Sequence, residues 1–94
     1  MKIPKKVKVG PLHYTVKCEK QVSDGSRTLA GQADHDNLTI HLEQCAQEQM
    51  EDTFFHESLH CISSTFHIGL SEEQVYVLSP ALLAFLKDNR LLRE

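Results

Sequence analysis

The sequence has few of the features typical of membrane-spanning or nucleic-acid-binding proteins. Tryptophan is absent, only 6% of the residues are aromatic, and the formal net charge is −3. Few aromatic side chains and an acidic balance argue against nucleic-acid binding, which depends on contacts to phosphates. The apolar runs are too short for a transmembrane helix, and no signal-peptide pattern is visible. We therefore expect a cytoplasmic protein that binds neither membrane nor nucleic acid.

Cysteine is also scarce. The three cysteines, Cys18, Cys45 and Cys61, are odd in number, and no two have the Cys-x-x-Cys spacing of a metal site. In a cytoplasmic chain this predicts free thiols. Cys61 falls on the apolar side of a predicted helix, so its expected role is core packing.

The chain is short, with 94 residues of which 40% are hydrophobic. This length predicts a single domain over residues 1–94 with a modest core. A metal ion that joins two elements would add to the stability of such a small fold.

The most informative segment is His56-Glu57-Ser58-Leu59-His60. On a helix, positions i and i+4 lie one turn apart on one face, so both histidines can bind one metal ion. Glu57 projects about 100° away from His56, beside the metal, where a general base for a water molecule belongs. Two neutral nitrogen ligands, a third protein ligand and an open position are the components of a zinc hydrolase site.

A helix over residues 47–64 would present this motif. The segment lacks glycine and proline, and its apolar residues lie on one broad arc. The arc comprises Met50, Phe54, Phe55, Leu59, Cys61 and Ile62. His56 and His60 fall almost opposite its centre, where either a cleft or solvent would lie. Glu51 suits the first turns of this helix electrostatically, and Cys45 could begin it as a weak cap.

A zinc site needs a third ligand, and a second predicted helix supplies candidates. Ser71 and Gln74 have the spacing of a capping box, which starts a helix after a break at Gly69. Its expected buried stripe consists of Val75, Leu78, Leu82, Phe85 and Leu86. Glu72 lies about 70° from the middle of that stripe and Glu73 about 170° from it. We predict Glu72 as the third ligand and Glu73 as the alternative. A simpler reading is that Glu72 only complements the helix dipole.

His67 is a competing ligand. The long metalloprotease signature requires Gly at position 63 and His at position 66, whereas this chain has Ser63 and Phe66. On a continued helix, His67 would stand about 10 Å along the axis from His60, too far to share a metal ion. We therefore place it in a loop or along the cleft. The other histidines are expected at the surface: His13, His35 and His41.

The front half of the chain predicts a small sheet. Four runs have the apolar or alternating pattern of strands: residues 7–9, 13–18, 29–33 and 38–42. Gly10-Pro11 predicts a hairpin turn, residues 23–26 a turn or loop, and residues 34–37 a further turn. The predicted fold is α+β, with an antiparallel or mixed sheet of about four strands, an active-site helix and a second C-terminal helix.

With these motifs the chain resembles small phage and prophage proteins like the ImmA/IrrE metallopeptidases, in a stripped-down form. The resemblance runs through residues 2–9, 14–16, 38–40, 56–60, 70–75 and 85–89. It implies a zincin in which His56, His60 and Glu72 bind Zn²⁺ and Glu57 is the base. One departure is Pro80, which replaces the usual continuation of the family helix. The second helix is therefore expected to kink or to restart there.

Together these features predict a zinc metallopeptidase. Glu57 would be the general base, and the strand at 38–42 would bind an extended peptide by strand addition. Tyr76 and His67 are the candidate donors to the developing oxyanion. The resemblance implies a peptide or protein substrate, such as a repressor or another regulatory protein of the bacterial host cell.

Two other interpretations remain open. A zinc-stabilised, phage-encoded binding module would use the same metal ligands with little or no turnover. Glu57 distinguishes it from the enzyme, because only catalysis requires that carboxylate. A metal-free α+β adaptor would leave the histidine motif on a solvated helix face.

Overall fold

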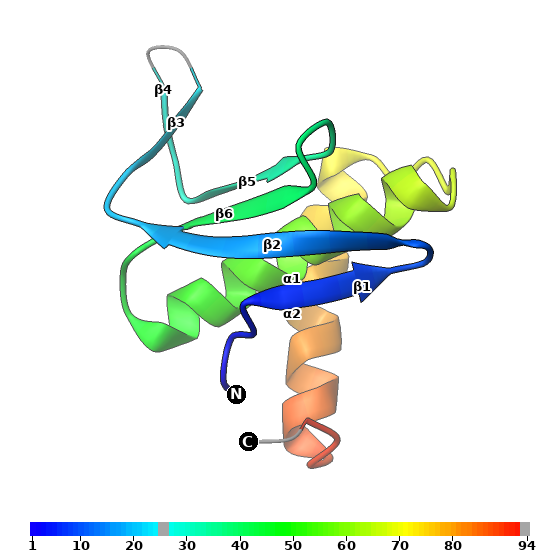
Figure 1. Cartoon of the computed structure of the whole chain (residues 1–94). Helices are drawn as coiled ribbons and strands as arrows, with labels where there is room; N and C mark the ends of the chain where they lie inside the picture. Colours follow the sequence, from blue (N-terminus) through cyan, green and yellow to red (C-terminus); the bar gives the residue numbers. More distant parts are fainter. Residues whose placement is uncertain (25–26, 93–94) are drawn as a thin grey trace.

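The computed structural model describes residues 1–24 and 27–92 and confirms the expected α+β fold (Figure 1). Six strands precede two helices within these residues. They are β1 (Lys6–Val9), β2 (Leu12–Glu19), β3 (Val22–Asp24), β4 (Arg27–Leu29), β5 (Gly31–Asp34), β6 (Thr39–Glu43), α1 (Gln47–Thr65) and α2 (Glu72–Asp88).

The main sheet is mixed and has the strand order β1-β2-β6-β5. The β1–β2 hairpin is antiparallel and turns at Gly10, whose φ of +56° favours glycine. β2 pairs in parallel with β6, and β6 pairs antiparallel with β5. The expected sheet of about four strands is thus confirmed, and β1 and β5 are its edges.

Two details of the sheet differ from expectation. Residues 23 and 24, expected in a turn or loop, belong to β3, which pairs with β4 in a two-stranded ribbon that projects from the sheet in Figure 1. Residues 25 and 26 themselves lie outside the described part. The strand expected at residues 29–33 is divided at Ala30, where β4 has ended and β5 has not begun.

α1 lies across one face of the sheet and packs on the core (Figure 1). The largest fully buried side chains there are Tyr14, Ile40, Leu42 and Cys61. Core packing of Cys61 is therefore confirmed, and all three thiols are free, with Cys18 and Cys45 exposed. α1 has Ala46 as its N-cap and no side-chain cap, so the prediction of Cys45 as a cap is wrong.

α2 packs on α1, and its predicted capping box is present. The helix runs through Pro80 without a break, so it does not restart there. The predicted buried stripe is confirmed only in part: Val75 is buried and Leu82 and Leu86 are half-buried, but the other buried residues are Ser79 and Leu83, which the stripe did not include. Two members of the expected stripe, Leu78 and Phe85, are 44% and 58% exposed. The cause is that α2 is apolar around nearly its whole circumference, so hydrophobicity alone cannot select the packed side.

Glu51 is buried, at 3% exposure, although we expected it only to complement the helix dipole. Its carboxylate pairs with the Lys87 ammonium and lies 3.2 Å from the Met1 amine. Gln47 Nε2 donates to it at 3.1 Å. These contacts tie the start of α1 to the end of α2 and to the N-terminal segment. Neither α1 nor α2 combines the length and apolarity needed to cross a membrane.

Candidate metal centre

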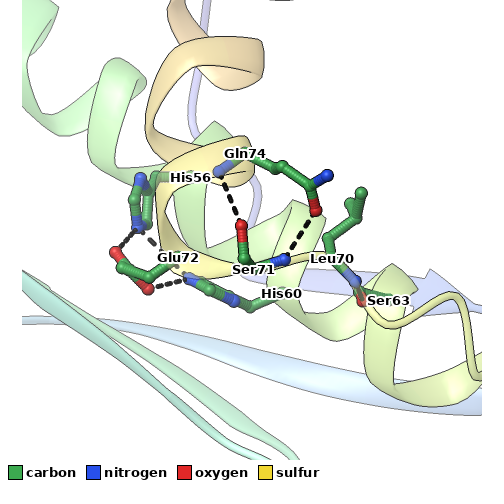
Figure 2. Close-up of polar contacts among 7 residues, drawn as sticks. All are labelled: His56, His60, Ser63, Leu70, Ser71, Glu72 and Gln74. Atoms are coloured by element: carbon green, nitrogen blue, oxygen red, sulfur yellow. Dashed lines mark hydrogen bonds and ion pairs between the residues drawn. The ribbon is translucent and has the colours of Figure 1, made fainter.

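The two histidines of the motif meet at one point. α1 places His56 and His60 one turn apart, with their Nε2 atoms 3.3 Å from each other (Figure 2). Their side chains are only 18% and 22% exposed. The pair therefore faces a partly covered site, as a cleft would require, and not open solvent.

Glu72 completes the group from α2. One carboxylate oxygen lies 2.8 Å from His56 Nε2 and the other lies 2.7 Å from His60 Nε2. Within the described residues, these three side chains form the one group of three His, Cys, Asp or Glu residues able to hold a metal ion. Glu73, the alternative ligand, is exposed and is not a member of the group.

Three local features place Glu72 at this point (Figure 2). Ser71 accepts the Gln74 N–H at 3.1 Å, and the Gln74 side chain accepts the Ser71 N–H at 2.8 Å, so the first turn of α2 is fixed. Gly69 has a φ of +78°, which permits the change of direction between the helices. The buried Ser63 hydroxyl accepts the Leu70 N–H at 2.9 Å and ties this connection to α1.

The donor set fits a zinc ion. At Zn–N and Zn–O lengths of about 2.0–2.1 Å, tetrahedral ligand atoms stand about 3.3 Å apart. The two Nε2 atoms have this separation, and the carboxylate oxygens are somewhat closer because they contact the imidazoles directly. Two imidazoles and one carboxylate also leave a fourth position open, as catalytic zinc sites do.

Glu57 lies beside the group and is not part of it. Its side chain points toward the sheet and the residue is 9% exposed. Burial raises the pKa of the Glu57 carboxyl above its ordinary value, and the nearby His56 and His60 partly lower it again. The Ala33 backbone N–H donates to this carboxylate, which connects α1 to the edge strand β5. A carboxylate with a raised pKa, held next to a metal site, is suited to general-base chemistry.

The edge strand beside this site is β5. The predicted substrate strand at residues 38–42 corresponds to β6, which is paired on both sides and cannot accept another strand. Ala30 O accepts from Glu43 N at 2.9 Å, so alternate residues of β5 face β6. By the same alternation, the backbone groups of Gly31 and Ala33 face away from β6, and the Ala33 N–H is the one that donates to Glu57.

Two hollows flank the metal ligands. One, of about 330 Å³, is lined by Leu29, Ala30, Gly31, Asp52, Thr53, His56, Glu57, Glu72 and Tyr76. The other, of about 440 Å³, is lined by His35, His60, Ser63, Ser64, His67, Gly69 and Leu70. Leu29 and Ala30, just before β5, line the first hollow, and His35, just after β5, lines the second. β5 therefore runs past the ligands from one hollow to the other.

His35 is a site residue that the sequence reasoning missed. We expected it in a surface turn, and it does lie in the β5–β6 turn and is exposed, but it also lines the hollow next to His60. The hydroxyl of Tyr14, which is 1% exposed, lies 3.1 Å from His35 Nδ1. Asp34 accepts the Asn37 N–H at 3.1 Å and holds the turn. The pairing of β5 with β6 brings His35 here, which no local signal could reveal.

The two sequence candidates for an oxyanion donor lie on different sides of the site. His67 follows α1 with a φ of +55° and lines the same hollow as His35, so its expected loop position is confirmed. Tyr76 is 72% exposed and lines the other hollow with Glu72.

Comparison with known proteins adds no further assignment. No family model, curated protein or solved structure matches the chain. The fold and the geometry of the residues therefore carry the functional argument. What they define is an α+β protein with a candidate His-His-Glu metal centre beside a sheet edge.

Proposed function

We propose that this protein is a zinc-dependent metallopeptidase. The observation that carries the proposal is the division of roles among neighbouring residues. His56, His60 and Glu72 converge within hydrogen-bonding distance, while Glu57 stays outside the group and reaches the edge strand. A site built only to hold a metal ion has no need of this fourth, nearly buried carboxylate.

The chain would hold Zn²⁺ through His56 Nε2, His60 Nε2 and Glu72. When bound, the ion would supply Lewis-acid polarisation and lower the pKa of a water molecule. Glu57 would take the proton from that water and deliver it to the leaving amine of the scissile peptide. Its hydrogen bond from Ala33 would keep the carboxylate oriented during both transfers.

The substrate would bind as an extended peptide along β5. The outward backbone groups of Gly31 and the Ala33 carbonyl would pair with it, and its side chains would occupy the two flanking hollows. Strand addition at this edge supports an endopeptidase acting on an extended segment of a peptide or protein.

His35 is our choice of donor to the developing oxyanion. The Tyr14 hydroxyl contacts two acceptors, His35 Nδ1 and the Cys61 sulfur. An imidazole nitrogen is the stronger acceptor of the two, so we assign the Tyr14 O–H as donor to His35 Nδ1. The ring proton then resides on Nε2, where it is available to the hollow. This arrangement favours His35 over Tyr76 and His67, because a buried partner fixes its tautomer.

The resemblance to ImmA/IrrE-like proteins remains part of the proposal. It suggests a regulatory protein as substrate and the cytoplasm of a bacterial host cell as the location. A second candidate function, a zinc-stabilised binding module, is favoured by one observation. The ligands come from two helices, so a bound metal ion would brace α1 against α2.

Metal content and proteolysis together test the proposal. Protein purified without added metal or a histidine tag should contain one zinc ion per chain, and His60→Ala should lose it. Glu57→Gln should keep the zinc and lose at least 100-fold in peptide hydrolysis. Zinc in both proteins with no hydrolysis by either would favour the binding module, and equal hydrolysis by both would contradict the role of Glu57 as the base. A folded wild type that does not take up zinc would refute both.

A further inference from the structure

One side of α2 is apolar and uncovered. Residues 75–86 contain no charged side chain, and the helix packs on α1 through Val75, Ser79 and Leu83. The opposite side, which we call the outer face, consists of Val77, Leu78, Ala81 and Phe85. Val77, Leu78 and Phe85 are 69%, 44% and 58% exposed. A helix that is apolar on both sides is expected to have a second partner.

The outer face is separate from the metal centre. At about 100° per residue, Glu72 projects about 165° away from the middle of the outer face. A partner on the outer face would therefore leave the metal ligands and both flanking hollows accessible. The face needs an explanation independent of the proposed catalysis.

The outer face has both a groove and a side chain that could fill one. The groove, of about 660 Å³, lies at the N-terminal half of α2 and is lined by Leu70, Ser71, Glu73, Gln74, Val77, Leu78 and Ala81. Phe85 projects from the C-terminal half, one helical turn beyond Ala81. The groove lies on one side of the small residue Ala81, and Phe85 lies on the other. Two copies of the outer face are therefore complementary to each other.

We propose that the outer face binds a second copy of this chain, with the two α2 helices antiparallel and Ala81 at the two-fold axis. In that arrangement residue 85 of each copy lies opposite residue 77 of the other. Phe85 of each copy would then fill the groove of the other, and the small Ala81 side chains would let the helices approach closely.

The charges at the two ends of α2 favour the antiparallel orientation. Glu73 stands at the rim of the groove, and Asp88 and Arg90 stand at the C-terminal end of the helix. In the proposed register Asp88 of one copy lies opposite the uncharged Gln74 of the other, and Arg90 lies near Glu72 and Glu73. An antiparallel pair also opposes the helix dipoles favourably. A parallel pair would place the acidic ends together.

The expected dimer is weak. A helix of 17 residues is about 25 Å long. One face of it is smaller than the roughly 800 Å² per partner of a standard stable interface. We therefore expect a monomer–dimer equilibrium with a dissociation constant in the micromolar range, which depends on protein concentration.

Sedimentation velocity over a concentration series from about 5 µM to about 500 µM tests the proposal. Wild type should shift from monomer to dimer, and Ala81→Arg and Phe85→Glu should each raise the dissociation constant at least tenfold. Tyr76→Glu is the matched control: it changes another exposed aromatic residue on the same helix, outside the outer face, and should dimerise like wild type. Circular dichroism should confirm that every variant is folded.

A charge exchange tests the orientation. Glu73→Arg and Arg90→Glu should each weaken association, and the double variant should restore it. A wild type that stays monomeric at every concentration would overturn the proposal. So would a dimer that Ala81→Arg and Phe85→Glu leave unchanged. Zinc content and peptidase activity do not enter these measurements, so the dimer and the proposed function can fail separately.

Discussion

At the scale of single residues, the candidate site depends on side chains that hold other side chains in place. Glu72 is 69% exposed, so little packing restrains it. Its position follows from the capping box formed by Ser71 and Gln74 and from the bond between Ser63 and the Leu70 N–H. None of these residues is a candidate metal ligand, yet they determine whether the three ligands meet.

We expect Ser71→Ala to weaken zinc binding. Loss of an N-cap costs about 1 kcal/mol, and if that cost falls on the metal-bound turn it lowers zinc affinity about fivefold. Competition with a zinc-binding dye would measure the affinity. Gln49→Ala, at an exposed position of α1, is the control and should bind zinc like wild type. Unchanged affinity in Ser71→Ala would show that Glu72 is positioned without its cap.

His35 provides a second prediction at this scale. His35→Ala should lower kcat roughly 10- to 1,000-fold with little change in KM, because the lost hydrogen bond forms to the oxyanion and not to the bound peptide. Zinc content should stay the same. Tyr14→Phe should show a smaller loss of kcat. His67→Ala changes the other histidine of the same hollow, and if it alone lowered kcat, the oxyanion donor would be His67.

At the scale of secondary-structure elements, β5 brings the sheet against α1, the helix that carries His56 and His60. Gly31 permits this close approach, because a Cβ atom there would lie 2.5 Å from Thr53 Cγ2 and 3.3 Å from Glu57 Cγ. A side chain at position 31 must therefore push β5 away from α1 or displace Thr53. Glycine is required here by contact, and not by its backbone angles.

Gly31→Ala should consequently lower both stability and activity. Overpacking at a tight contact costs about 1–3 kcal/mol, and the displaced strand would no longer hold the Ala33 N–H against Glu57. Urea unfolding and peptide hydrolysis would measure the two losses. Thr53→Ala removes the nearest methyl group and should restore part of both in the double variant. If the single and double variants behaved alike, the contact with Thr53 would not be the cause.

The elements also show how far the sequence could predict the site. His56 and His60 lie on one helix and Glu72 lies in the first turn of the next, beside its capping box. Local sequence spacing is therefore sufficient to predict that the three side chains meet. The edge role of β5 and the position of His35 depend on the strand order, which joins residues far apart in the chain. The predicted stripe on α2 is right at Val75 and wrong at Leu78 and Phe85, which are exposed while Ser79 is buried. Close packing against α1 determines which side of α2 is buried, and hydrophobic periodicity cannot predict it.

At the scale of the whole molecule, Glu51 links the two helices and the N-terminal segment. The hydrogen bond from Lys87 lowers the pKa of the Glu51 carboxyl below its ordinary value, against the effect of burial. Since the folded-state pKa is depressed, the stabilisation is present above the unfolded pKa of about 4.3. It is lost as the pH falls through the lower folded-state value.

Glu51→Gln should therefore destabilise the protein at pH 7 by about 1–3 kcal/mol, because Lys87 and the Met1 amine lose their charged partner. The difference from wild type should shrink as the pH falls below about 4.3. Urea unfolding at pH 7, 5 and 3 would measure it. Glu48→Gln, in the exposed first turn of the same helix, should change stability little at any of these pH values.

The parallel pairing of β2 with β6 has a consequence for the order in which the protein folds. The β1–β2 and α1–α2 hairpins each close over a short stretch of chain, whereas β2 must wait for a strand some twenty residues further on. Pairing across long loops is slow, so the central β2–β6 pair is expected to form late, after the β1–β2 and β5–β6 hairpins. The three metal ligands, in contrast, belong to the local helical hairpin. A newly made chain would thus bring the three candidate ligands together before the two hairpins of the sheet join.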